Sequence, residues 1–441
     1  MTTLETEESP ASPADKALVA NPPLPLRVNS LYSAMGLALY CAMNWGMQIV
    51  VAKTGTPTML GEYALGVAVT QPIITMAQLN LKSLQTTDSR RQFEFGHYLA
   101  LRLLCLAVAL PVFAIAAIAQ PSRVDGLVVF LTGCGVAFDA VSDIYYGFLQ
   151  RRERFDRIGK SMAFKGLLSL TLLAVLLHVS HNIVWGIFGS ALASAVIATF
   201  YDVPAIGWVF GAGNRTQSRA INTPLWDWAK IGTLLRLAIP LAIGMFLMSV
   251  TANAPRYFVQ RYLGEHDLGL FSAIASLTVI TRTVVIAIGS AMSARMADRF
   301  HAGDRRGFVA TAAKLLLVGV AVSAAAPVAG ALFGRPLITL VFSKEYAHDM
   351  ALCILLLSAG GVQNLGAIIG FTITAGRYLA IQAYWTAAAL VATAGLSVYL
   401  VPKLGLRGAA LAWLLAMVVQ ALFGFAIVGH MMRRFPPRQA A

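Results

Sequence analysis

The chain has 441 residues, of which 58% are hydrophobic and only 12% are charged. A soluble domain is usually about 45–50% apolar and about 25% charged, so this composition excludes an ordinary water-soluble globular protein. Lys and Arg outnumber Asp and Glu by 34 to 20. In a membrane protein such an excess sets the orientation of the helices, and we expect no nucleic-acid partner.

The chain begins with a polar, Pro-rich segment, residues 1–27, in which no basic region precedes a short apolar core. We expect a disordered cytoplasmic tail and not a cleavable signal peptide. A membrane-spanning helix needs about 20 mostly apolar residues. Twelve stretches meet this requirement, at residues 29–52, 61–82, 96–119, 125–149, 161–180, 183–209, 236–259, 267–290, 310–333, 349–373, 378–400 and 408–430.

Alternate connections between these stretches are strongly basic, as in "QRRERFDRIGK" at 150–160 and "SARMADRFHAGDRR" at 293–306. Basic segments favour the cytoplasm, so we place both termini there, in a multi-pass protein of the bacterial inner membrane. Residues 211–235 divide six spans from six. We predict a bundle at 28–210, a cytoplasmic or interfacial linker at 211–235, a second bundle at 236–430 and a basic cytoplasmic tail at 431–441.

Two short motifs recur half a chain apart. "LGEYALG" at 60–66 returns as "LGEHDLG" at 263–269, and "GIFGSALA" at 186–193 returns as "GLRGAALA" at 405–412. In each pair the motifs join the same spans of the two halves, which indicates a parallel repeat whose halves can rock about a central site. The sequence thus predicts an all-α integral membrane protein with twelve transmembrane helices in two pseudo-symmetric six-helix bundles around a central cavity.

Charged side chains at membrane depth are costly, so they usually face a partner or a wet cavity. Asp139 and Asp143 are four residues apart and share a helix face, and Arg102 lies at about the depth of Asp143. We expect Arg102 to pair with Asp143. Asp139 has no obvious cationic partner in the sequence, so it is a candidate proton or cation carrier; a purely structural role for these charges is the alternative.

Arg282 lies close to the middle of its predicted span, and a lone arginine facing a cavity suits phosphate. The alternative is a structural ion pair with Asp202. Asn44, Asn80 and Asn253 add polar groups to the first two helices of the halves, which is consistent with a shared polar cavity. The four cysteines form no CxxC pair, the outer loops are short and there is no nucleotide-binding motif. We therefore predict a non-enzyme without catalytic residues, metal ligands or cofactors.

Four segments carry a family resemblance: "LNLKSLQTTDSRRQFEFGHYLALRL" (79–103), "DAVSDIYYGFLQRRERFDRIGKS" (139–161), "NAPRYFVQRYLGEHDLGLFSAIASL" (253–277) and "FSKEYA" (342–347). They resemble bacterial O-antigen, capsule and exopolysaccharide flippases of the multidrug/oligosaccharidyl-lipid/polysaccharide superfamily. The resemblance implies that an undecaprenyl-diphosphate-linked oligosaccharide is moved from the cytoplasmic to the periplasmic leaflet. It implies Arg282, Arg102 and Arg256 as candidates for binding the diphosphate, and Asp139 and Asp143 as ion-coupling residues.

The implied partners are the lipid-linked oligosaccharide, membrane lipids, and a polysaccharide polymerase with its chain-length regulator. Three other functions stay open. A multidrug antiporter of the same superfamily would have a more acidic cavity for cationic drugs. A membrane glycosyltransferase or polymerase would need a larger catalytic loop, and a non-transporting scaffold of an assembly complex would not need the buried charges.

Overall fold

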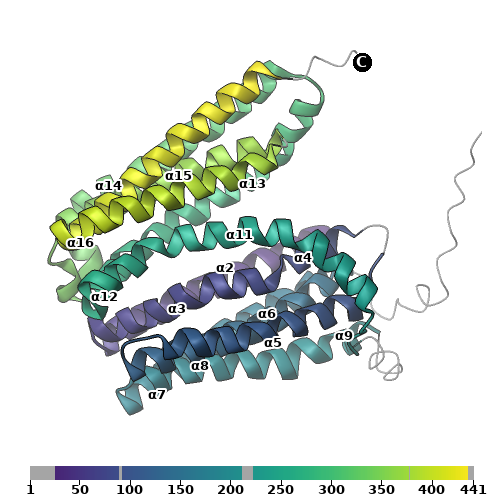
Figure 1. The fold of residues 1–441 in the computed structure, drawn as a ribbon, viewed down its shortest axis with the longest axis horizontal. Helices are drawn as coiled ribbons and strands as arrows, with labels where there is room; N and C mark the ends of the chain where they lie inside the picture. The colour runs from purple at the N-terminus through teal and green to yellow at the C-terminus, as the bar shows by residue number, and fades with distance from the viewer. Residues whose placement is uncertain (1–24, 89–91, 211–221, 377, 436–441) are drawn as a thin grey trace, which may run out of the picture.

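The computed structural model describes residues 25–88, 92–210, 222–376 and 378–435, and these are almost entirely helical, with no β-strand among them (Figure 1). The predicted N-terminal tail, residues 211–221 of the predicted linker and most of the C-terminal tail lie outside the described residues. Polar caps start many of the helices, because their side chains accept hydrogen bonds from the first free backbone N–H groups. These caps are Thr56, Ser122, Asn182, Asp227, Asp304 and Asp349.

The first bundle runs to Phe210 (Figure 1). Its helices are α2 (Leu26–Thr54), α3 (Pro57–Gln78), α4 (Leu81–Thr87), α5 (Phe95–Ile118), α6 (Arg123–Arg151), α7 (Phe155–Ser180), α8 (Ile183–Ile197), the π-helix η1 (Ala198–Asp202) and α9 (Val203–Phe210). The second bundle has α11 (Trp228–Leu263), α12 (Glu265–Ser276), α13 (Thr278–His301), α14 (Arg305–Val341), the 3₁₀ turn η2 (Lys344–Ala347), α15 (Met350–Ala375) and α16 (Leu379–Arg433).

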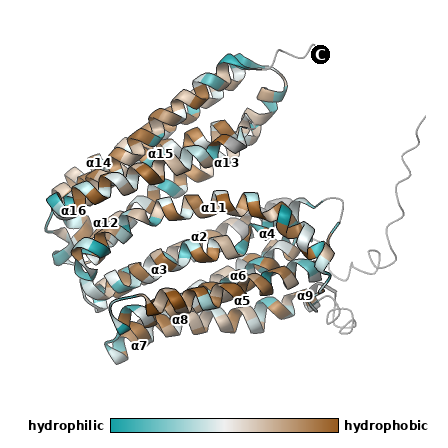
Figure 2. Cartoon of the chain, viewed as in Figure 1, coloured by the Kyte–Doolittle hydropathy of each residue, from teal (hydrophilic) through white to brown (hydrophobic). Residues whose placement is uncertain are grey.

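Large apolar side chains cover the outside of both bundles. Ile118, Phe200 and Leu340 are 84%, 76% and 73% exposed, which in water would favour aggregation but in a bilayer places them against lipid. Figure 2 shows hydrophobic residues along the helices and hydrophilic residues gathered towards their ends. The protein is therefore a multi-pass membrane protein.

Eleven helical stretches of the described residues are long and apolar enough to cross a membrane. The last of them, Ile381–Arg433, has 53 residues, far more than the roughly 20 that one crossing needs. Gly405 interrupts it with a non-helical conformation, φ 58° and ψ −138°. A left-handed φ of this kind suits glycine, so the stretch accounts for two predicted spans and the structure is consistent with twelve.

The repeated motifs lie where helix backbones meet. At Gly61 a Cβ atom would collide with the backbone oxygen of Glu265, and at Gly269 it would collide with that of Pro57. The first motif of one bundle thus packs against its own repeat in the other. The two copies of the second motif make the same kind of contact in their halves. A Cβ at Gly189 or Gly408 would collide with a carbonyl oxygen of the preceding span. Glycine allows this close approach of backbones.

Contacts between the bundles concentrate where α3 meets α12 and α11. The Tyr257 hydroxyl of α11 donates a hydrogen bond to the carbonyl of Ala68 in α3. Nearby, Trp45 Nε1 of α2 donates to Ser276 Oγ of α12 at 3.1 Å. From this end the bundles diverge towards the end that carries α4, α9 and the C-terminus (Figure 1). The basic loops predicted to be cytoplasmic, 150–160 and 293–306, belong to the diverging end.

The structure corrects the prediction for the linker. The second bundle was expected to begin at residue 236, but α11 begins at Trp228, because Asp227 caps it by accepting from the N–H groups of Ala229 and Lys230. The preceding residues are held against the first bundle, where Leu225 N donates to Gly96 O at 3.0 Å.

Candidate functional site

A cavity of about 590 Å³ lies between α3 of the first bundle and α11, α13, α15 and α16 of the second. Hydroxyl and amide side chains supply most of its polar lining. The amides are Gln71, Asn253, Gln363, Asn364, Gln382 and Gln420. Ligand sites in proteins usually have about 300–1,000 Å³ and a few convergent polar groups, so this cavity has the size and chemistry of a binding site.

Arg282 is the one charged residue among the described residues that line the cavity. It lies 17 residues after Glu265 and 19 before His301, near the middle of the stretch formed by α12 and α13. The alternative pairing with Asp202 does not occur, since Asp202 contacts residues of α7 in the first bundle. Arg282 is therefore available to a ligand in the cavity, and its role in binding substrate stays a prediction.

Asn253 also lines this cavity, and Arg256 lies one turn further along α11. The Arg256 guanidinium donates a hydrogen bond to Asn253 Oδ1 at 2.9 Å, while Asn253 Nδ2 donates to Ser249 O at 2.9 Å. Arg256 is not among the described lining residues, so its link to the cavity runs through Asn253.

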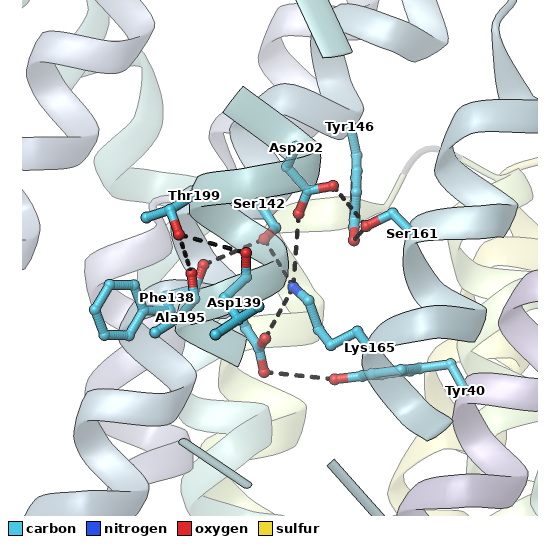
Figure 3. A network of polar contacts seen from close by, with 11 residues as sticks. Tyr40, Phe138, Asp139, Ser142, Tyr146, Ser161, Lys165, Ala195, Thr199 and Asp202 are labelled. Carbon is cyan, nitrogen blue, oxygen red and sulfur yellow. Dashed lines mark hydrogen bonds and ion pairs between the residues drawn. The ribbon is translucent and has the colours of Figure 1, made fainter. Parts of the chain in front are cut away.

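A network of buried polar groups occupies the first bundle, centred on Lys165 of α7 (Figure 3). Lys165 Nζ lies 3.0 Å from Asp139 Oδ1 and 3.9 Å from Asp202 Oδ2, and it donates a hydrogen bond to Ser142 Oγ at 2.7 Å. Lys165 is 3% exposed and Asp202 is fully buried. The expectation that Asp139 has no cationic partner is therefore wrong.

Further contacts hold this network in place. Ser161 Oγ donates to Asp202 Oδ1 at 2.5 Å, and the Tyr146 hydroxyl lies 2.7 Å from Ser161 Oγ. The Tyr40 hydroxyl of α2 donates a longer bond, 3.5 Å, to Asp139 Oδ2 (Figure 3). The network thus joins α2, α6, α7 and η1.

A second group of charges surrounds Asp143, one turn from Asp139. Its Oδ2 lies 3.6 Å from a guanidinium nitrogen of Arg102, so the expected pair is present, and its Oδ1 lies 3.3 Å from Lys82 Nζ, which was not expected. Arg102 is fully buried, also donates to Ala77 O at 3.4 Å, and is absent from the described lining of the cavity. Arg102 is therefore not exposed to the cavity in this structure, and its role as a substrate-binding residue stays a prediction.

Two predicted cavity residues lie elsewhere. Asn80 falls outside the spanning helix, because α3 ends at Gln78 and Asn80 adopts a left-handed conformation with φ 48° at the start of α4. Its Oδ1 accepts a hydrogen bond from Ser83 at 2.8 Å. Asn44 donates to the carbonyl of Tyr40 at 2.9 Å and so lies beside the network of the first bundle.

Sequence reasoning missed Lys165 and the part played by Asp202. The predicted span begins at residue 161, whereas α7 begins at Phe155, which puts Lys165 about 15 Å along the helix. The signal that could have revealed it is the lysine within an apolar stretch. Asp202 ends a π-helix, whose wider turn changes the direction in which the following side chains point.

The sequence and fold match known proteins. A family described as "Polysaccharide biosynthesis protein" matches residues 46–296, and a second, MatE, matches residues 240–394. The capsular polysaccharide biosynthesis protein CapF of Staphylococcus aureus is 24% identical over 385 residues, which are 87% of this chain and 93% of that protein.

Two solved structures share the fold. One is the inward-facing conformation of a multidrug resistance MATE family transporter of the MOP superfamily, with a TM-score of 0.70 and 14% identity over 91% of this chain and 99% of that one. The other is the lipid II flippase MurJ in an inward closed conformation, with a TM-score of 0.70 and 11% identity over 92% of this chain and 90% of that one. Because the family match covers more than half of its residues, this chain belongs to the polysaccharide biosynthesis protein family and has the fold of the MOP superfamily.

Proposed function

We propose that the protein is an alternating-access flippase that moves an undecaprenyl-diphosphate-linked oligosaccharide from the cytoplasmic to the periplasmic leaflet of the bacterial inner membrane. The observation that carries this proposal is the lining of the cavity, in which Arg282 is the one charged residue described. A diphosphate has about two negative charges, and charge-assisted hydrogen bonds from the planar guanidinium group replace part of its lost hydration.

The shape of the molecule supports the direction of entry. The bundles are joined where α3 meets α12 and diverge towards the basic loops (Figure 1). With those loops in the cytoplasm, the cavity is approached from the side on which lipid-linked precursors are made. Outward movement of the diphosphate is also favoured electrically, by about 2.3 kcal/mol per charge for each 100 mV of negative inside potential.

The charged network of the first bundle is the proposed site of ion coupling. Lys165, Asp139 and Asp202 join three helices of this bundle, so a change in the protonation of one carboxylate alters contacts among all three. Asp139 is the proposed carrier, because its side chain is 27% exposed while Lys165 and Asp202 are buried. Asp143 has two cationic partners and is assigned to holding α4, α5 and α6 together.

The cavity argues against the drug-antiporter alternative. A site for cationic drugs is expected to contain carboxylates, and the described lining contains none. The same proposal retains a polysaccharide polymerase and a chain-length regulator as partners, in line with the CapF relative, whose name places it in capsular polysaccharide biosynthesis.

The test replaces Arg282 in a strain whose own copy of the gene is deleted. Arg282→Ala should be folded but should restore less than about a tenth of the surface polysaccharide, whereas Arg282→Lys should restore an intermediate amount because it keeps the charge and loses the planar fork. Arg335→Gln serves as the matched control, since Arg335 is exposed and lies outside the cavity. Full restoration by Arg282→Ala, at equal protein level, would remove Arg282 from the substrate path.

A further inference from the structure

Three glutamines of the cavity have free amide groups. Gln71, Gln363 and Gln420 are half-buried, and no hydrogen bond from their side chains to other described residues is found. An unsatisfied polar group at membrane depth costs several kcal/mol unless water or a ligand satisfies it. These three residues come from α3, α15 and α16 and face one cavity, so the same ligand can reach all of them.

The chemistry of these groups restricts the ligand. Each amide carries two N–H donors and a carbonyl acceptor. A hydroxyl group both donates and accepts, so a ligand with several hydroxyl groups satisfies the amides in either orientation. An apolar ligand would leave them unpaired, and a cationic ligand would lie beside Arg282 without a carboxylate to balance it.

A buried tryptophan fixes the position of one of these amides. Trp385 is 6% exposed and packs in a hydrophobic cluster with Ile369 and Ala421. Its Nε1 donates a hydrogen bond to the carbonyl of Gln420 at 2.6 Å, so it holds the backbone from which the Gln420 side chain extends into the cavity.

Glycines on α15 allow a close approach to Gln420 and Trp385 of α16. A Cβ atom at Gly366 would lie 3.5 Å from Gln420 Oε1, and one at Gly370 would lie 3.6 Å from the Trp385 ring, both ordinary contact distances. Alanine is therefore tolerated at either position, whereas a larger side chain would occupy the cavity. The two helices can therefore lie this close because Gly366 and Gly370 have no side chains.

The position of Arg282 indicates which part of the cavity is free for the sugars. Asn364 Nδ2 donates to Thr281 Oγ1 at 3.1 Å, which joins the middle of α15 to the residue before Arg282. Gln382 and Thr374, which are hydrogen-bonded at 2.8 Å, line the cavity near the end of α15 that faces the basic loops. Gln363, next to Asn364, is therefore level with Arg282, and the cavity continues from there towards Gln382 and Thr374, which leaves room for the sugars of a ligand whose diphosphate lies at Arg282.

We propose that the second bundle contains a sugar subsite, in which Gln363 and Gln420 bind the first uncharged sugars of the glycan, Trp385 positions Gln420, and Arg282 holds the diphosphate. This inference rests on the proposed function and adds to it a ligand class and a set of specificity-determining residues. Polar recognition of this kind can discriminate strongly, because an analogue that lacks the hydroxyl groups leaves buried amides unpaired.

The test measures binding to the purified full-length protein in lipid nanodiscs. The probes are a bare polyprenyl diphosphate and three polyprenyl diphosphates that carry a trisaccharide beginning with a hexose, an N-acetylhexosamine or a hexuronic acid. The wild-type protein should bind at least one glycosylated probe about tenfold more tightly than the bare lipid. Gln363→Leu, Gln420→Leu and Gly366→Leu should bind the bare lipid as the wild type does and should lose the preference for sugar.

Gln120→Leu is the matched control, because Gln120 follows the end of α5 and lies outside the cavity. This variant should keep the preference for the glycosylated probes. Arg282→Ala should weaken binding of all four probes. Equal affinity of the wild type for bare and glycosylated probes would overturn the sugar subsite and leave the flippase proposal standing. Failure of the wild type to bind any of the four probes would overturn both. A folded Gln363→Leu variant that keeps the full preference would also contradict the subsite.

Discussion

The ammonium nitrogen of Lys165 lies 3.0 Å from Oδ1 of Asp139, inside a helical bundle whose outer surface faces lipid. Asp202 approaches the same ammonium group at 3.9 Å. One lysine thus balances two aspartates from different helices. A charge without its partner is expensive at membrane depth, so the three residues have to be considered together.

The first prediction is that loss of Lys165 destabilises the protein. Lys165→Met leaves Asp139 and Asp202 without their shared cation, and breaking a buried pair from one side typically costs about 3–5 kcal/mol. We expect less folded protein in the membrane and a lower thermal transition in detergent. Lys160→Met, an exposed change on the same helix, is the matched control.

The Lys165→Met/Asp202→Asn double variant should recover part of the loss, because it removes one of the two unbalanced charges. Additive effects of the two single changes would show that the residues are not energetically coupled. A Lys165→Met protein that is as abundant and as stable as the wild type would contradict the buried network.

The second prediction concerns ion coupling. Asp139→Asn keeps the contacts of Lys165 with Asp202 and Ser142, so the variant should fold. If Asp139 carries the coupled proton, transport by this variant should no longer respond to an imposed proton gradient. The measurement is flipping of a fluorescent polyprenyl diphosphate in proteoliposomes with and without a gradient. An unchanged response to the gradient would exclude Asp139 as the carrier.

The third prediction is that Asp143→Asn destabilises the protein more than Arg102→Met does. Asp143→Asn leaves fully buried Arg102 without a carboxylate, so we expect a loss of about 3–5 kcal/mol. Arg102→Met leaves Asp143 with Lys82 at 3.3 Å, so the loss should be smaller. Thermal unfolding of both variants, with Lys82→Met alongside, measures the difference. Equal losses from Asp143→Asn and Arg102→Met would mean that Lys82 does not compensate.

These charges show how far the sequence predicts the site. Matched depth along two helices was enough to pair Arg102 with Asp143, because helix rise is constant. Lys165 was missed because the apolar stretch begins six residues after Phe155, where α7 starts, so this lysine lies deeper in the helix than the apolar stretch indicates. No periodicity rule foresees the π-turn that orients Asp202.

The fold was easier to predict than the cavity. Hydrophobic length and the repeated glycine motifs predicted the helices and their duplication, since both follow from local composition. Arg282 was recognised because a lone charge at membrane depth is conspicuous. Gln363, Gln420 and Trp385 were not, because which face of α15 or α16 borders the cavity depends on how the bundles pack.

The fourth prediction concerns the effect of pH on Asp349, the residue that caps the start of α15. Hydrogen bonds from Arg407, with those from the Leu352 and Ala351 N–H groups, hold the pKa of Asp349 below its usual value. The stabilisation is therefore present above the unfolded pKa of about 4 and is lost as the pH falls through the folded pKa. Asp349→Ala should cost about 1 kcal/mol at pH 7, since it also removes the cap of α15.

Asp349→Asn separates the two contributions, because asparagine is an equally good cap and lacks the charge. The wild type should have a higher unfolding temperature than Asp349→Asn at pH 7, and the difference between the two temperatures should shrink below about pH 4. A difference that persists in acid would show that the charge of Asp349 is not its cause.

The last prediction concerns the contact that joins the two bundles at the end proposed to face outwards. Gly61 of the first bundle packs on the backbone oxygen of Glu265 in the second, and the symmetric Gly269 packs on that of Pro57. A methyl group at Gly61 cannot fit while α3 and α12 stay in this contact. Gly61→Ala should therefore raise the population of molecules that are open on the outer side, because it destabilises only the closed arrangement.

The measurement uses Gln71→Cys, which places a thiol in the cavity, and a membrane-impermeant maleimide added to whole cells. Protein without Gln71→Cys gives the background from the four native cysteines. Labelling from outside should be several-fold faster with Gly61→Ala than without it. Gly244→Ala is the matched control, because a Cβ there meets no atom within 4 Å and should leave labelling unchanged. If folded Gly61→Ala protein is labelled no faster than the control, the contact of the repeated motifs does not control access to the cavity from outside.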